Sequence, residues 1–376
     1  MFSGGLSNPM IPLYASTLTT SLLLIGMVTS SFWAIRIVSE MPIGVISDHI
    51  GRRKPIVTGI LFGFLGTVLF AATDNIFLII VGQAIRGAGM ATFFCVSMAM
   101  LTEIVPPQSR GRAMGIFQSI EFIGSTLGAA LGGMVASILG YRGLFWVCTS
   151  VAFCAFTLSL FLSSSDRKAE GKSIEAFKQT LKRMPSLVNL TMIVICFIIL
   201  LMMVKDSGFM MTTMPLYVKF YLGMSLTDVS LVMASRGTGV ALGSVSGGWL
   251  SDRMGRERVL AIGLALSALS IFFVPTATSF ILLAFLMFME GMGMGYVQCT
   301  VPVLVTDMFP SMRGPSIGLY RTFFDMGGFV GPFIVTIIVS LYGYTNIFYI
   351  ITGLMLLNLI ASSLLRRKTT YLDKKL

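Results

Sequence analysis

Long apolar runs dominate this chain, and short stretches of glycine, proline and charged residues separate them. Several runs approach or reach the ~20 residues that a helix needs to cross the hydrocarbon core of a bilayer. The pattern therefore predicts twelve membrane-spanning helices. The predicted spans are 1–20, 22–46, 55–73, 76–104, 113–138, 144–162, 187–219, 228–250, 259–275, 279–306, 315–340 and 347–365.

The composition supports an all-α membrane protein surrounded by a lipid bilayer. Hydrophobic residues make up 55% of the chain and charged residues only 11%, whereas soluble domains carry about a quarter charged residues. A formal net charge of +11 would suit a nucleic-acid partner only if it formed a basic face on a soluble domain. The excess basic residues lie in loops, so we predict no nucleic-acid partner.

Cysteine and histidine usage argues against metal chemistry. The cysteines lie in apolar segments without C-x-x-C spacing, which favours buried packing over disulfides or metal binding. His49 is the only histidine, which argues against a metal site built from histidines. We predict no metal and no cofactor.

The distribution of basic residues predicts the orientation. The loops after even-numbered spans and the tail carry nearly all loop arginines and lysines, whereas the opposite loops carry only Arg142 and Lys219. Cytoplasmic loops hold such an excess, so both termini are predicted to be cytoplasmic in a multi-pass protein of the cell membrane.

The chain also aligns with itself at an offset of 203 or 204 residues. Pro12-Leu13-Tyr14 falls on Pro215-Leu216-Tyr217, and the motif beginning at Ser47 falls on the one beginning at Ser251. Many transporters consist of such repeats, with the substrate site at the repeat interface. We predict two pseudo-symmetric six-helix halves, namely 1–162 and 187–365, with a cytoplasmic linker at 163–186 and a cytoplasmic tail at 366–376.

The same offset makes the first span look short. Its counterpart begins about fifteen residues before the point that would align with Met1. Either an upstream start codon precedes this sequence, or the first helix lacks its cytoplasmic half.

The segment Gly44-Val45-Ile46-Ser47-Asp48-His49-Ile50-Gly51-Arg52-Arg53-Lys54 resembles the loop motif after helix two of the major facilitator superfamily. A second copy begins at Gly248, and the likeness covers nearly the whole chain. The resemblance implies two bundles around a central cavity and alternating access. The implied gating residues are Gly44, Asp48, Gly51, Arg52, Arg53, Glu103, Gly248, Asp252, Gly255, Arg256 and Asp307.

The motif has a physical rationale. Asp48 can accept hydrogen bonds from a helix N-terminus, and Arg52 with Glu103 can form a charge relay that holds the inward side shut. Arg256 and Asp307, together with Asp252, would form its mirror image. The basic residues also enforce topology, and we expect both roles.

Helix five resembles the glycine-rich motif of the drug:proton antiporter branch, with Ala129 where that branch has a proline. The matching glycines are Gly115, Gly124, Gly128, Gly132 and Gly133. Close helix packing is the plainer explanation. On helix four, Gln83 and Arg86 stand where the family has Arg and Gln, and residues three apart share a helix face, so Arg86 can reach the same cavity.

Ionised groups inside the predicted spans require a cavity or a partner, since each costs at least ~2.5 kcal/mol at a helix centre. We predict that they serve proton coupling or line the substrate cavity. They are Arg36, Glu40, Arg86, Glu121, Lys205, Asp206, Arg236, Glu290, Arg321 and Asp325.

Two of these pairs are spaced for contact along one helix. Arg36 and Glu40 are four residues apart, as are Arg321 and Asp325. In the resembled fold their helices are neighbours across the two halves, so the four groups could exchange partners as a gate. A static salt-bridged cluster is the alternative.

Glu121 has no charged neighbour three or four positions away, and we predict that it couples transport to protons. Asp206, Glu290 and Asp325 are the competing candidates. Glu290 would instead be neutralised if it faced Arg86 across the pseudo-twofold axis.

Span seven contains Lys205 and Asp206 followed by Gly208, which predicts a local helix break that exposes backbone to the cavity and contacts substrate. Arg236 in span eight either binds an anion or extends toward the membrane surface.

Together these features predict a monomeric secondary transporter that exchanges protons for a small organic solute exported from the cytoplasm. Proton-coupled uptake of a charged metabolite is the first alternative. A membrane-embedded enzyme or a receptor is the second, but no phosphate loop, nucleophile triad or metal cluster is evident in the sequence.

Overall fold

A computed structural model describes residues 1–106, 110–162, 189–309 and 313–373, and the elements within these ranges are helices. The chain divides into two compact units, which we call the N-terminal unit (Met1–Lys182) and the C-terminal unit (Arg183–Leu376). The predicted linker 163–186 lies outside the described residues. Helix α13 continues through most of the predicted tail.

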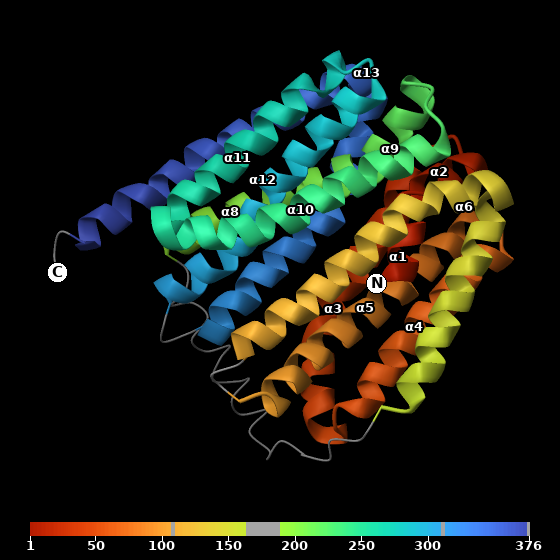
Figure 1. Ribbon diagram of the computed structural model, residues 1–376, viewed down its shortest axis with the longest axis horizontal. Coiled ribbons are helices and arrows are strands. Elements are labelled where there is room, and N and C mark those ends of the chain that lie inside the picture. The colour runs from red at the N-terminus through yellow and green to blue at the C-terminus, as the bar shows by residue number, and fades with distance from the viewer. Residues whose placement is uncertain (107–109, 163–188, 310–312, 374–376) are drawn as a thin grey trace. The chain divides into compact units, whose positions relative to one another are not determined.

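The N-terminal unit is a bundle whose elements run from red to yellow in Figure 1. Helix α5 packs against both α3 and α4, while α6 packs against α1 and α4. The elements are α1 (Phe2–Ser7), α2 (Ile11–Leu18), α3 (Leu22–Ile50), α4 (Arg53–Ala72), α5 (Ile76–Ile104) and α6 (Arg110–Leu160).

Helix starts in this unit follow ordinary capping chemistry. The Ser21 hydroxyl accepts from the backbone N–H of Leu24 at the start of α3, and the Asn75 side chain accepts from that of Phe77 at the start of α5. These contacts satisfy backbone donors that the first helical turn leaves without a partner.

The first predicted span, 1–20, consists of two short helices rather than one. Helix α1 ends at Ser7 and α2 begins at Ile11, with a turn between them that contains Asn8 and Pro9. Proline lacks an N–H donor and its ring disrupts a helix interior. The break leaves the exposed Asn8 side chain within reach of Arg86 on α5.

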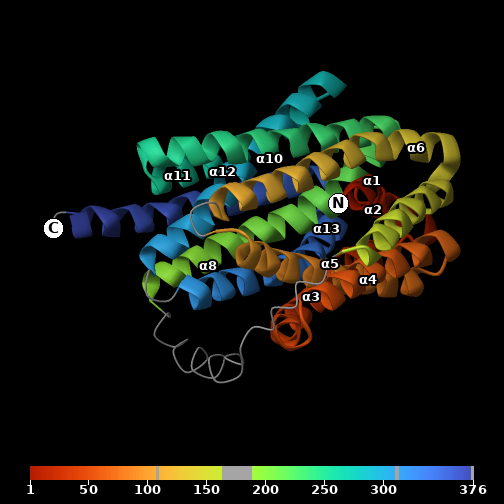
Figure 2. The same cartoon turned by 60° about the horizontal axis from the view of Figure 1, so that its bottom comes forward.

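The C-terminal unit repeats the central-helix arrangement. Helix α12 packs against both α10 and α11, and α13 packs against α8, η3 and α11 (Figure 2). The elements are α8 (Leu190–Met203), η3 (Val204–Thr213), α9 (Met214–Leu216), η4 (Tyr217–Tyr221), α10 (Leu226–Met254), α11 (Arg256–Phe273), η5 (Val274–Thr276), α12 (Phe280–Met308) and α13 (Arg313–Asp373).

Predicted span seven has a wide-turn backbone, because η3 and η4 are π-helical. The backbone N–H of Met214 bonds the carbonyl of Phe209, and the hydroxyls of Thr212 and Thr213 bond the carbonyls of Ser207 and Gly208 five residues back. π-Helical turns are rare and are found frequently at functional sites. The local irregularity predicted near Gly208 is therefore confirmed.

Eight helical segments in the described ranges are long and apolar enough to cross a membrane. Two of them, α6 and α13, contain a glycine with non-helical geometry, at Gly140 (φ 70°) and Gly343 (φ 78°). A positive φ is readily adopted only by glycine, so the chain turns at these two points. The described ranges therefore contain several helices suited to a multi-pass membrane protein.

Candidate functional site

Four charged side chains from three elements meet inside the C-terminal unit, and we call them the charge tetrad: Lys205 and Asp206 of η3, Arg236 of α10 and Glu290 of α12. Lys205 donates to Glu290 Oε1, Arg236 Nε lies 2.6 Å from Glu290 Oε2, and Arg236 also donates to Asp206 Oδ1. The hydroxyl of Ser267 on α11 lies 3.3 Å from Lys205 Nζ and 3.2 Å from Glu290 Oε1.

The tetrad is electrically balanced and closed. Two cations face two carboxylates, and the Lys205 and Glu290 side chains are fully buried. Removing one member of such a group strands a buried charge, which typically costs ~3–5 kcal/mol. The prediction that Arg236 extends toward the membrane surface is wrong, because its guanidinium is drawn inward by Asp206 and Glu290.

The backbone around the tetrad is covered rather than open. Gly208 lies directly against the backbone of Gly331 on α13, and the Ser207 hydroxyl donates to the carbonyl of Gly328 at 2.7 Å. A side chain at Gly208 would collide with that backbone. The prediction that this break exposes backbone to a cavity is therefore wrong, because α13 fills the space.

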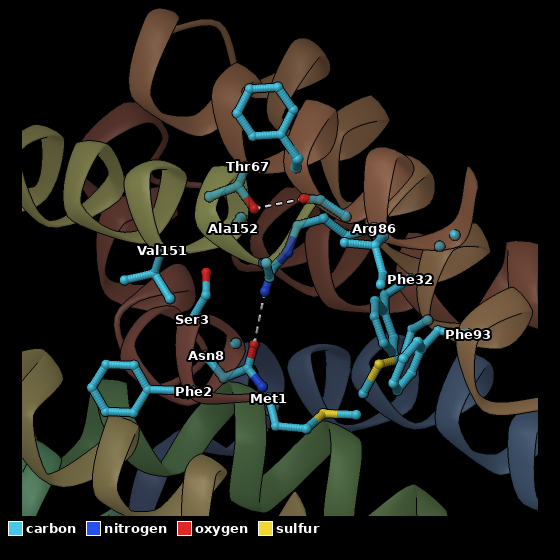
Figure 3. Close-up of a pocket in the computed structure, with 18 residues that line it drawn as sticks. Met1, Phe2, Ser3, Asn8, Phe32, Thr67, Arg86, Phe93, Val151 and Ala152 are labelled. Atoms are coloured by element: carbon cyan, nitrogen blue, oxygen red, sulfur yellow. Dashed lines mark hydrogen bonds between the residues drawn. The ribbon is translucent and has the colours of Figure 1, made fainter. Parts of the chain in front are cut away.

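The N-terminal unit contains a cavity of about 350 Å³ into which Arg86 of α5 projects (Figure 3). Its walls are mainly apolar. Figure 3 shows Phe32 and Phe93 on one side of the cavity, with Phe2 and Val151 on the other.

Neutral groups hold the Arg86 guanidinium. It donates to Gln83 Oε1 at 2.9 Å, to Ser7 Oγ at 3.0 Å and to Asn8 Oδ1 at 3.4 Å. Its guanidinium carbon lies 5.4 Å from the ring centroid of Phe70, within cation–π range. Within the described ranges no carboxylate pairs with Arg86, although the residue is only 9% exposed.

The geometry predicted for the fourth span, 76–104, is confirmed in part, and this span is helix α5. Gln83 and Arg86 lie on one face of α5 and hydrogen bond to each other, and Arg86 reaches a cavity. The neutralised state predicted as the alternative for Glu290 is present, but its partners are Lys205 and Arg236 of its own unit.

Glu121 lies on α6 near the Met1 end of the cavity. The charges of Glu121 and Arg86 both act on the amino group of Met1, and Gly124, one turn along α6, lies against Met1 and Phe2. Glu121 is partly exposed. Its role in proton coupling stays a prediction.

Both copies of the loop motif contain the predicted ion pair. Arg52 contacts Glu103 at 2.6 Å and the Ser47 hydroxyl at 2.5 Å. Arg256 contacts Asp307 at 2.5 Å and Asp252 at 3.7 Å. The gating role stays a prediction.

Backbone geometry at the motif also recurs. Gly51 and Gly255 end α3 and α10 with φ of 84° and 88°, and Arg53 donates to the carbonyl of Leu160 on α6 at 2.5 Å. Gly248 has open space around it. The side chain of Asp48 and the surroundings of Gly44 lie outside the part of the chain that the structure describes.

The Arg36–Glu40 pair predicted along α3 is present at 3.0 Å, with the guanidinium 4.9 Å from the Trp33 ring centroid. On α13, Asp325 is buried and Arg321 is exposed. Exchange of partners among these groups stays a prediction.

The glycines of the fifth predicted span, 113–138, lie in α6 and allow close helix packing, as the plainer explanation predicts. Gly128 and Gly132 lie against the backbone of Phe2 and Leu6, which lets α6 approach α1 closely. Gly124 and Gly133 flank this contact on α6.

Several site residues were not found from the sequence. Ser267 carries no sequence signal, since a serine in an apolar helix is usually satisfied by its own backbone. Asn8 could have been found from the Asn8-Pro9 helix break, and Phe70 only from the packing of α4 on α5.

Comparisons with known proteins agree with this architecture. A family model described as Major Facilitator Superfamily matches residues 1–220 and 196–375. Multidrug resistance protein MdtG of Proteus mirabilis is 24% identical over 323 residues, which cover 85% of this chain and 80% of that protein. The MdtG of Salmonella arizonae is 26% identical over 354 residues, covering 92% and 84%.

Two further relatives extend over nearly the whole chain. An uncharacterized transporter of the same superfamily type from Methanocaldococcus jannaschii is 25% identical over 368 residues, covering 94% of both chains. A crystal structure of a mutant of the nucleoside transporter NupG shares the fold, with a TM-score of 0.79, 14% identity and 96% of both chains covered.

Proposed function

The chain belongs to the major facilitator superfamily, and on this premise we propose that it is a secondary active transporter that exports small organic solutes in exchange for protons. Its similarity to multidrug resistance proteins supports export. The observation that carries the proposal is the cavity around Arg86, which offers a solute site between helices apolar enough to cross a membrane.

The proposed architecture has twelve spans in two pseudo-symmetric halves that alternate access to a central site. Turns at Gly140 and Gly343 divide α6 and α13 into two spans each, while α1 with α2 and the less apolar α10 supply the remaining two. The recurrent ion pairs of the loop motif support the repeat. The transporter would be a monomer in the cell membrane with both termini in the cytoplasm.

Glu121 is the proposed proton carrier. Asp206 and Glu290 are less suited, because a proton on either would leave a buried cation of the tetrad without its counter-charge. Glu121 is partly exposed, and its charge acts on the nearby amino group of Met1. Asp325 is the remaining candidate.

Proton movement in proteoliposomes tests the proposal. Substrate added to vesicles with an imposed pH gradient should dissipate that gradient with the wild type and leave it unchanged with Glu121→Gln. Arg142→Gln, a change at an exposed pair with Asp74, serves as the matched control and should behave as wild type.

Other outcomes would redirect the proposal. Proton movement that persists in Glu121→Gln and disappears in Asp325→Asn would move the proton site to α13. Solute and protons moving in the same direction would establish uptake by symport, and solute flux without proton movement would contradict proton coupling.

A further inference from the structure

We propose that the cavity of the N-terminal unit binds amphipathic organic anions, with the Arg86 guanidinium as the anchor for a carboxylate or another small anionic group. This inference names the substrate class of the proposed transporter, so it rests on the proposed function. Its first support is that Arg86 is a buried cation whose partners, among the described residues, are neutral oxygens and one aromatic ring.

The second support is that Arg86 is positioned without being neutralised. Gln83, Ser7 and Asn8 each accept a hydrogen bond, which fixes the guanidinium while leaving its full positive charge. The Ser7 hydroxyl donates its own proton to the carbonyls of Ser3 and Gly4, so its oxygen is oriented to accept. A buried charge of this kind is stabilised most by an incoming anion.

The third support is the shape and lining of the cavity. A volume of about 350 Å³ is within the usual range of ~300–1,000 Å³ for small-molecule sites and suits a compact solute. Phe32, Phe64 and Phe93, with Met90, offer an apolar surface for a flat ring. Gly63 of α4, which also lines the cavity, has open space where a side chain would stand.

The charge tetrad shows why the assignment falls on this cavity. Every cation of the tetrad already has a carboxylate partner within the C-terminal unit. Arg86 is also largely buried, yet it lacks one among the described residues, and we assign its electrostatic complement to a solute. A cationic solute would be repelled at the same place.

The test compares three probes with one ring system and different head-groups: 2-naphthoate, 2-naphthamide and 2-naphthylmethylammonium. Binding to the purified full chain in nanodiscs is measured by titration calorimetry, with empty nanodiscs subtracted and no pH gradient present. We expect the carboxylate to bind at least ~tenfold more tightly than the amide and the ammonium to bind most weakly.

Variants at Arg86 separate charge from fit. Arg86→Gln should abolish the preference for carboxylate over amide while keeping amide binding. Arg86→Lys should keep part of the preference, since an ammonium retains the charge but loses the planar fork that matches a carboxylate. Arg142→Gln should retain the wild-type preference.

Equal binding of carboxylate and amide to the wild type, or an unchanged preference in both Arg86 variants, would overturn the inference. The arms also distinguish it from the proposed function. Anion binding without coupled proton movement would refute exchange and retain the anion site, whereas proton movement driven only by cations, with no naphthoate binding, would retain exchange and refute the anion site.

Discussion

The two units bury the same kind of charge in opposite ways. In the C-terminal unit, Lys205 and Arg236 are matched by Glu290 and Asp206, and no charge of the tetrad is left over. In the N-terminal unit, the partners of Arg86 among the described residues are neutral, and Arg86 faces a cavity. The difference teaches that burial of a charge does not by itself indicate a binding site, and the anion site that we propose rests on the missing counter-charge beside a cavity.

The largest loss of stability is expected from a substitution that breaks the charge tetrad. Glu290→Gln leaves Lys205 and part of Arg236 without a counter-charge and should destabilise the unit by ~3–5 kcal/mol. The paired change Lys205→Met with Glu290→Gln keeps the Arg236–Asp206 pair and should recover much of that loss. Thermal unfolding of the purified variants measures both. A double variant no more stable than the single one would refute the view that charge balance holds this region together.

A smaller effect of opposite kind is expected at the cavity. Arg86→Gln removes a buried charge that no carboxylate in the described part of the chain neutralises, and it keeps a side chain that can still hydrogen bond. Its thermal stability should therefore equal or exceed that of the wild type, within ~1 kcal/mol. If Arg86→Gln lost as much stability as Glu290→Gln, Arg86 would be part of the framework and the contrast between the units would fail.

The smallest effect on stability is expected at the repeated loop motif, where the ion pairs of the two units can be compared. Arg52 is nearly buried and contacts both Glu103 and Ser47, whereas Asp307, the partner of Arg256, is half exposed. Arg52→Gln should lose ~1–3 kcal/mol, and Arg256→Gln less than ~1 kcal/mol because exposed pairs are screened by water. Unfolding and transport rates are measured in parallel, and the reverse order would show that exposure does not rank the two ion pairs.

Interactions fixed by local geometry could be predicted from the sequence. The Arg36–Glu40 pair follows from the four-residue spacing of a helix, and the Arg52–Glu103 relay follows from the loop motif and its repeat. The irregular backbone near Gly208 could be predicted as well, since glycine beside charged residues weakens a membrane helix. What covers that backbone could not, because α13 lies more than a hundred residues further along the chain.

The sequence by itself determined the helices, their punctuation by glycine and proline, and the set of charges that had to be accommodated between them. Only the tertiary structure decided which charges neutralise one another. Lys205 and Glu290 are 85 residues apart in the chain and meet because the fold brings η3 close enough to α12 for their side chains to touch. Arg86 reaches instead a break in the first helix, where Ser7 and Asn8 offer neutral oxygens. Hydrophobic periodicity sets how each helix lies in the membrane, but the direction and partner of a long charged side chain depend on which helices surround it.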